Sequence, residues 1–292
     1  MKIVVPFGPG GPPDVIARII ARGLEKELKQ PVIVENMPGG STAIAARAVA
    51  RAEPDGCTLL AVDISFTVAS HVTPNYGLDP QKDFTAVGMT ARSPFSFIVS
   101  NSVSAQNLRA FIQIAKAKPN ELTIGHSGVG TTPHLAALSF IDAASIDVRL
   151  VPYRQIRDAT TNVIGGLISG VFSAANTAIG VKSSDRVRIL AITGDRRLPQ
   201  LPDVPTFAES GIDMRGFENG SWFGLAAPAK TPENIIARIN EALVKAAQDK
   251  DGQDKLAASG TTLSVNGPKE FGTLIANQSR FWLERLKAVG FQ

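Results

Sequence analysis

Two glycine-bearing loops contain the residues whose types and spacing suit the binding of an anion. They are residues 6–14, with the sequence PFGPGGPPD, and residues 125–134, with the sequence GHSGVGTTPH. Each loop lies between a strand-like run and a helical pattern, which is where open α/β sheets place their ligands. Glycine lets a backbone approach a ligand closely, and a helix start supplies N–H groups and the positive end of the helix dipole. A small carboxylate or a phosphate fits both loops.

Each loop also has other interpretations. The first loop is close to a dinucleotide-binding fingerprint, but Pro13 stands where the third glycine belongs, and a tight structural turn is a further alternative. In the second loop Ser127, Thr131 and Thr132 add hydroxyl donors, although Thr131 or Thr132 could instead cap the helix that begins near Pro133. Binding is favoured because the two loops would form a pair, one from each half of the molecule, facing each other across a cleft.

The remaining polar candidates each have a functional and a structural interpretation. Asp63 ends the third predicted strand, so it could receive a ligand amine or cap the short helix that follows. Asp14 lies one helical turn before Arg18, which favours an ion pair over a catalytic role. His126 and His134 suit helix packing or hydrogen bonding within the second loop, with a general base as the alternative.

The patterns typical of several enzyme and metal sites are missing from the sequence. It has no G-x-S-x-G elbow, no Walker lysine loop, no H-E-x-x-H and no cysteine pair. A single cysteine, Cys57, allows neither an intrachain disulfide nor a thiolate metal site, and its place at the start of an apolar run predicts a buried side chain. We therefore expect no catalytic residue, no metal and no cofactor.

Charge and hydropathy restrict the partners. The formal net charge is +4, but the basic residues are scattered and form no stripe with interleaved aromatic residues, so we expect no nucleic-acid binding. No run reaches the roughly 18 apolar residues of a membrane span, and no leader pattern precedes the first strand, although a removed leader would not be visible. We expect a monomer that does not insert into a membrane.

The elements that must position these loops alternate between strand and helix. In the first part of the chain the strands are predicted at residues 3–7, 31–35, 57–62 and 84–89, and the helices at 12–29 and 42–51. The pattern restarts with strands at 96–99, 122–125, 148–151, 171–173 and 187–192, and with helices at 105–118, 131–141 and 157–168. A strand at 218–227 and helices at 232–248 and 268–288 complete the chain. This alternation predicts an α/β protein with parallel sheets covered by helices.

Two such series, with helices left over at the end, indicate two lobes. We place lobe 1 at residues 1–96 and 216–292 and lobe 2 at residues 97–215, with the chain crossing near 93–97 and 212–217. Because aromatic residues make up only 6% of the chain, we expect the core to consist mainly of Ala, Val, Ile and Leu.

Six ordered motifs resemble the substrate-binding proteins of tripartite tricarboxylate transporters, also called Bug receptors. They are PFxxGGxxDxxAR at 6–18, VENxPGG at 34–40, PDGxTLL at 54–60, SGxGTxPHLA at 127–136, VPYR at 151–154 and WxGLxAPAxTP at 222–232. The resemblance covers nearly the whole chain in order. It implies a two-lobed type II periplasmic-binding fold, each lobe a mostly parallel sheet flanked by helices, with a cleft between the lobes.

The resemblance also implies a function. The protein would be a periplasmic receptor that captures a small carboxylate in the cleft for a membrane transporter or a sensor. An enzyme acting on a small acid in the same cleft and a ligand-sensing regulatory domain are the alternatives. The residues that the motifs place around the carboxylate are Phe7, Gly10, Gly11, Ser127, Gly128, Thr131 and Thr132. Those that would line the distal pocket are Asp63, Ala174 and Asn176.

The chain departs from the family pattern at several positions. Cys57 replaces the usual Tyr, and Gln155 replaces a Gly. Ser169 and Ser173 stand where acidic residues are usual. Because these last two changes affect charge in the second lobe, the identity of the ligand, above all a cationic or amino-acid one, does not follow from the resemblance.

Overall fold

The computed structural model describes residues 1–73 and 75–288, and it contains two compact units. The first unit consists of residues 1–92, 222–257 and 262 onward, and the second of residues 93–221 and 258–261. The lobe limits expected from the sequence remain a proposal about domains, and they follow the same order along the chain. The short return of residues 258–261 to the second unit was not expected.

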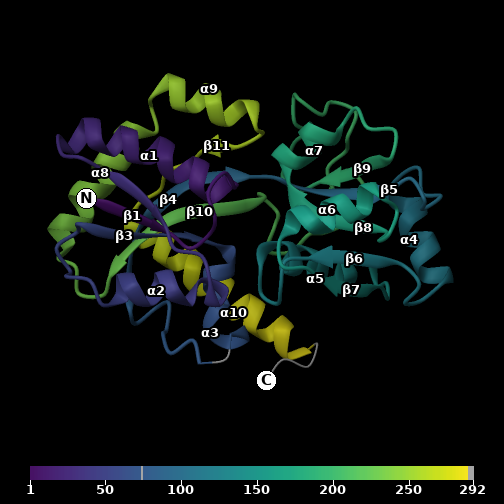
Figure 1. Cartoon of the computed structure of the whole chain (residues 1–292), viewed down its shortest axis with the longest axis horizontal. Coiled ribbons are helices and arrows are strands. Elements are labelled where there is room, and N and C mark those ends of the chain that lie inside the picture. Colours follow the sequence, from purple (N-terminus) through teal and green to yellow (C-terminus); the bar gives the residue numbers. More distant parts are fainter. Residues whose placement is uncertain (74, 289–292) are drawn as a thin grey trace. The chain divides into compact units, whose positions relative to one another are not determined.

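The first unit is built on a mixed sheet with the strand order β11-β4-β10-β3-β1-β2 (Figure 1). These strands are β1 (Lys2–Val5), β2 (Ile33–Asn36), β3 (Thr58–Asp63), β4 (Phe84–Ser93), β10 (Ser221–Pro228) and β11 (Thr262–Leu263). Its helices are α1 (Pro12–Leu28), α2 (Ala43–Ala50), α3 (Ala69–Val72), α8 (Glu233–Ala246), α9 (Lys250–Ala258) and α10 (Pro268–Ala288), with short 3-10 turns η1 (Gly40–Thr42) and η2 (Ile64–Thr67). Helices α1 and α8 cover one face of the sheet, and α2 and α10 lie on the other.

The second unit contains a mixed sheet with the strand order β7-β6-β8-β5-β9. The strands are β5 (Phe95–Ser100), β6 (Thr123–His126), β7 (Arg149–Pro152), β8 (Gly170–Ala174) and β9 (Val187–Ile192). The helices are α4 (Leu108–Ala117), α5 (Thr132–Ala144), α6 (Ile156–Ile164) and α7 (Ala175–Val181). As the sequence indicated, strands and helices alternate through this unit.

The two sheets contain more antiparallel strand pairs than the expectation of mostly parallel sheets allowed. Strands β1, β2 and β3 are parallel, as are β6, β7 and β8. However, β10 runs antiparallel to β3, and β5 runs antiparallel to both β8 and β9. A parallel pair within a βαβ unit needs a crossover connection. Strands β5 and β10 lie outside such units, because each enters its sheet directly after the chain passes from one unit to the other.

The core of the second unit also differs from the expected aliphatic one. A group of phenylalanine rings packs on one face of the sheet, with centroid separations of 4.7 Å between Phe97 and Phe172 and 4.9 Å between Phe97 and Phe111. Phe140 and Phe207 extend the group. The opposite face has the aliphatic packing that was predicted, from Ile98, Val163, Val171 and their neighbours. This one layer therefore holds five phenylalanines of a chain that has 14.

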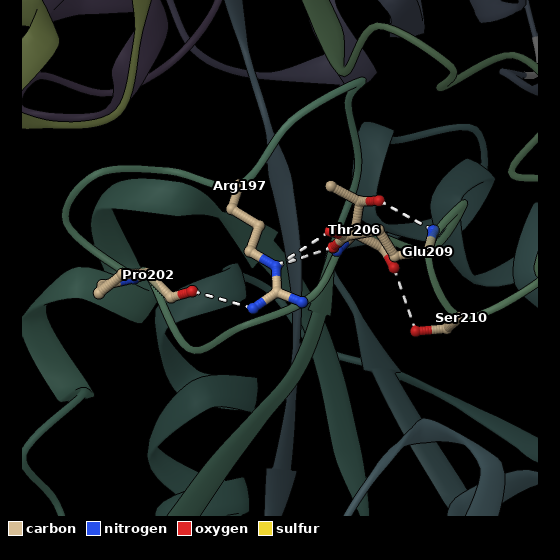
Figure 2. A network of polar contacts seen from close by, with 5 residues as sticks. All are labelled: Arg197, Pro202, Thr206, Glu209 and Ser210. Carbon is tan, nitrogen blue, oxygen red and sulfur yellow. Dashed lines mark hydrogen bonds and ion pairs between the residues drawn. The ribbon is translucent and has the colours of Figure 1, made fainter.

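A network of hydrogen bonds connects residues of the chain segment that follows β9 (Figure 2). The Thr206 N–H donates to Glu209 Oε2 at 2.7 Å, and the Glu209 N–H donates to Thr206 Oγ1 at 3.0 Å, which is the reciprocal pattern of a capping box. The guanidinium of Arg197 donates to both Glu209 carboxylate oxygens and to the Pro202 carbonyl. The Thr206 N–H and the Arg197 side chain hold the pKa of Glu209 below its usual value.

Cys57 does not have the predicted burial. Its side chain is exposed, because Cys57 lies just before β3 rather than within it. Partial burial and the neighbouring Asp55 carboxylate raise the pKa of the thiol. A raised pKa favours the protonated thiol over the thiolate.

Candidate functional site

The first loop leads into α1 through glycines and prolines. Gly10 adopts φ +84°, which favours glycine, and Gly11 is the residue that precedes the helix, with extended backbone. Pro12 and Pro13 fill the first two helical positions, where no intrahelical N–H bond is needed. Because proline has no N–H, this helix start offers fewer donors than the glycine-loop argument assumed. The Gly11 N–H has no acceptor within the described part of the chain. It is therefore the backbone group at this helix start that could donate to a ligand.

Asp14 connects this loop to α1 and β2. Its carboxylate accepts the Gly10 N–H at 2.9 Å, the Arg18 Nε–H at 3.0 Å and the Asn36 amide at 2.9 Å. The same Asn36 amide donates to the Phe7 carbonyl at 3.0 Å. The predicted ion pair between Asp14 and Arg18 is confirmed, with 3.0 Å between Arg18 Nη2 and Asp14 Oδ1. Burial alone would raise the pKa of Asp14, but the bonds from Arg18, Gly10 and Asn36 outweigh it and lower that pKa.

Asp63 caps the short helix that follows it, which was one of its two expected roles. It is the last residue of β3 and precedes η2, and its Oδ1 accepts the Ser65 N–H at 3.0 Å together with the Ser65 hydroxyl. Since β1, β2 and β3 run parallel, Asp63, Asn36 and the first loop all follow the carboxyl ends of neighbouring strands. The first unit therefore gathers its predicted site residues along one edge of its sheet.

The second loop uses its hydroxyl groups internally. Thr131 Oγ1 donates to the Gly128 carbonyl at 2.7 Å, and Ser127 Oγ donates to Thr131 Oγ1 at 3.3 Å. Thr131 precedes α5, but its side chain makes no capping bond, and Thr132 is the first residue of the helix. The alternative that either threonine side chain caps the helix is therefore not what the structure shows: the Thr131 hydroxyl bonds to the loop carbonyl, and Thr132 lies past the capping position.

Two buried histidines lie beneath this loop. His126 Nδ1 accepts the Gly128 N–H at 3.2 Å, and His134 Nδ1 accepts the Gly130 N–H at 3.3 Å. The two rings are 4.6 Å apart between centroids. Burial lowers the pKa of His126, and burial together with the nearby His126 lowers the pKa of His134 to about 3. Hydrogen bonding within the loop, one of the two structural interpretations of these histidines, is confirmed.

The predicted distal residues lie where β8 meets α7. Ala174 ends β8, and Asn176 is in the first turn of α7, where its Oδ1 accepts the Thr177 N–H at 2.9 Å. Strands β6 and β8 are parallel neighbours, so the second loop and residues 174–176 follow the same edge of this sheet. Each unit thus assembles its own set of the predicted residues.

Two kinds of residue were missed as parts of the site. Asn36 had been quoted only as a motif letter, yet it holds both the Phe7 carbonyl and Asp14. Its position directly after a predicted parallel strand was the available signal. His126 and His134 were both expected near the second loop, but the close approach of their two rings was not predicted. No three His, Cys, Asp or Glu side chains gather in a metal-binding arrangement within residues 1–73 and 75–288.

None of the described helices combines the length and apolarity that crossing a membrane requires. The chain is similar to several solved proteins over almost its entire length. The periplasmic binding protein BugD is 27% identical, with a TM-score of 0.85 and coverage of 100% of this chain and 98% of BugD. MatC from Rhodopseudomonas palustris, solved with bound malate, is 29% identical with a TM-score of 0.84, covering 98% of each chain. Another R. palustris protein, solved with adipate, is 28% identical with a TM-score of 0.86, covering 99% of this chain and 97% of that one.

These likenesses confirm the expected fold, which is that of periplasmic binding proteins. The family model described as "Tripartite tricarboxylate transporter family receptor" matches residues 16–291. The six motifs, the fold and this match agree, and the chain belongs to the tripartite tricarboxylate transporter family of receptors.

Proposed function

We propose that this protein is a periplasmic receptor that captures a small carboxylate and delivers it to a tripartite tricarboxylate-type transporter or to a sensor. The observation that carries the proposal is the pair of relatives solved with malate and with adipate, both of which match nearly the whole chain. Both ligands are dicarboxylates, so a dicarboxylate is the first class to test.

The backbone chemistry of the two loops supports this proposal. The Gly11 N–H of the first unit and the Ser127 and Val129 N–H groups of the second have no acceptor within residues 1–73 and 75–288. Backbone N–H groups at helix starts favour carboxylate oxygens. We propose that both sets bind one ligand in a cleft between the lobes, with Phe7, Gly10, Thr131 and Thr132 beside it. In the same proposal Asp63, Ala174 and Asn176 line the distal end of the pocket.

No observation favours an enzyme that uses His126 or His134 as a base. Both rings are buried, at 4% and 3% exposure, and the Nδ1 atom of each already accepts a backbone N–H. A base must reach the proton that it removes, and these acceptor atoms are occupied. We infer that the protein binds its ligand without chemistry.

The test of this function is calorimetry of the purified chain with malate, adipate, acetate, citrate and glutamate, together with native mass spectrometry for a co-purified acid. We expect micromolar binding of at least one acid. The matched variant is Gly11→Val, which we expect to weaken that binding about tenfold or more, because a side chain would stand where the backbone must approach the ligand. A Cβ at Gly11 meets only Pro13 Cδ, at 3.8 Å, so the fold should tolerate it.

Gly267→Val is the control for the Gly11 variant. Gly267 also precedes a helix-starting proline, Pro268 of α10, and a Cβ there meets nothing within 4 Å. We expect this variant to bind like the wild type. If no acid of the panel binds, the receptor function is wrong. If Gly11→Val binds like the wild type, the site is not at this loop.

A further inference from the structure

The N–H groups of the second loop divide into two sets. Those of Gly128 and Gly130 donate to the two buried histidines, and that of Thr131 lies 3.4 Å from the Gly128 carbonyl oxygen. Those of Ser127 and Val129 have no acceptor within the described residues. Every second N–H along residues 127–130 is thus held by the protein, and the ones between are left for something else.

The chemistry of imidazole makes this arrangement depend on one tautomer. A neutral imidazole has one donor nitrogen and one acceptor nitrogen. Because Nδ1 of each ring receives an N–H, each ring must be neutral with its hydrogen on Nε2. The low exposure of both rings keeps them in this form, since a buried imidazolium lacks the hydration it has in water.

We propose that His126 and His134 are positioning residues for carboxylate binding, holding Gly128 and Gly130 so that the Ser127 and Val129 N–H groups are presented to the ligand. The proposal rests on the proposed function and deepens it. It identifies the donors on this loop as two backbone N–H groups, because the Ser127 and Thr131 hydroxyls already donate within the loop.

Substitutions that keep or remove the acceptor atom test the proposal. Asparagine has its Oδ1 at the position of histidine Nδ1, whereas leucine has a similar shape and no acceptor. With malate and adipate as probes, we expect His126→Leu and His134→Leu to lose about tenfold or more in affinity, and His126→Asn and His134→Asn to stay within about threefold of the wild type. Thermal melting of all four variants, with binding stoichiometry, separates loss of the loop from loss of the fold.

A second measurement does not require a ligand. The ¹⁵N shifts of the imidazoles should show both rings neutral with Nε2 protonated, and amide exchange should be slow at Gly128 and Gly130 and fast at Ser127 and Val129. Adding malate or adipate should slow the last two amides. Leucine variants with wild-type affinity, asparagine variants as weak as the leucine ones, or an Nδ1-protonated ring would overturn the proposal. If the wild type binds no carboxylate, the proposed function fails, while the tautomer and exchange data still decide whether the histidines hold the loop.

Discussion

His134 is a buried side chain whose protonation depends on folding. Its folded-state pKa is about 3, against 6.5 for an unperturbed imidazole, because it is buried beside His126. Below pH 6.5 the unfolded chain binds a proton that the folded chain does not, so acid favours unfolding. The stability that depends on a neutral His134 is complete above pH 6.5 and is lost progressively as the pH falls from 6.5 towards 3.

This linkage gives a measurable prediction at the scale of one residue. Between pH 7.5 and pH 5 the free energy of unfolding should fall by about 2 kcal/mol on account of His134, since 1.5 pH units at about 1.4 kcal/mol each lie below the unfolded pKa. Urea unfolding followed by circular dichroism measures it, with His134→Asn as the reference that lacks the titrating ring. The same acid loss in both proteins would mean that His134 is not held neutral.

At the scale of an element, Asp14 fixes how the first loop leaves β1 and enters α1. One carboxylate bonds to the loop through Gly10, to the helix through Arg18 and to the end of β2 through Asn36. Removing a buried acceptor leaves its donors without partners, which costs more than the net value of one hydrogen bond. We expect Asp14→Ala to lower the free energy of unfolding by about 1–3 kcal/mol and to weaken carboxylate binding.

An exposed ion pair of the same chemistry supplies the control for Asp14. Asp213 pairs with Arg215 at 3.0 Å, but both side chains are more than half exposed. Because exposed pairs contribute little, Asp213→Ala should change the unfolding free energy by less than about 0.5 kcal/mol. Equal effects of the two substitutions, measured by the same urea titration, would show that Asp14 does not hold the loop.

The elements were largely predictable where their sequence is periodic. Helix α1 was expected at residues 12–29 and spans Pro12–Leu28. Its apolar residues recur at helical spacing. Two prolines begin the helix, and Lys29, in the left-handed conformation, ends it. Helix α9 was missed because its segment is mostly charged and polar. Helix α7 was missed because it starts directly after β8, with no loop residues to mark the change. A local sequence pattern does not reveal a helix whose residues show no apolar periodicity or no boundary with the preceding strand.

Within the candidate site, the sequence predicted positions better than partners. Both loops and the Asp14–Arg18 pair were predictable, since motif spacing and the helical turn fix them. The sequence left the Thr131 hydroxyl open between a ligand and a helix cap, and only the folded loop provides its actual partner, the Gly128 carbonyl. Strand direction was also undetermined, because alternation of residue types does not say which neighbour β5 or β10 will pair with.

At the scale of the whole molecule, the connections between the two units suit a hinge. The chain passes between units near residues 92–93 and 221–222 and again around residues 258–261, so each unit keeps its own sheet and core. Two bodies joined by a few segments can change their relative position while their cores stay packed. A ligand that bonds to both bodies would favour the arrangement in which both sets of donors reach it.

On the proposal that one carboxylate bonds to both units, we predict that the bound acid makes the molecule more compact in solution. Small-angle scattering should show a smaller radius of gyration when malate or adipate saturates the wild type, because a ligand bonded to both units would hold them together. Gly11→Val at the same acid concentration should scatter like the unliganded protein, and Gly267→Val should follow the wild type. If calorimetry shows saturation while the radius of gyration stays constant, the ligand does not close the two lobes, and binding would then have to be complete within a single unit.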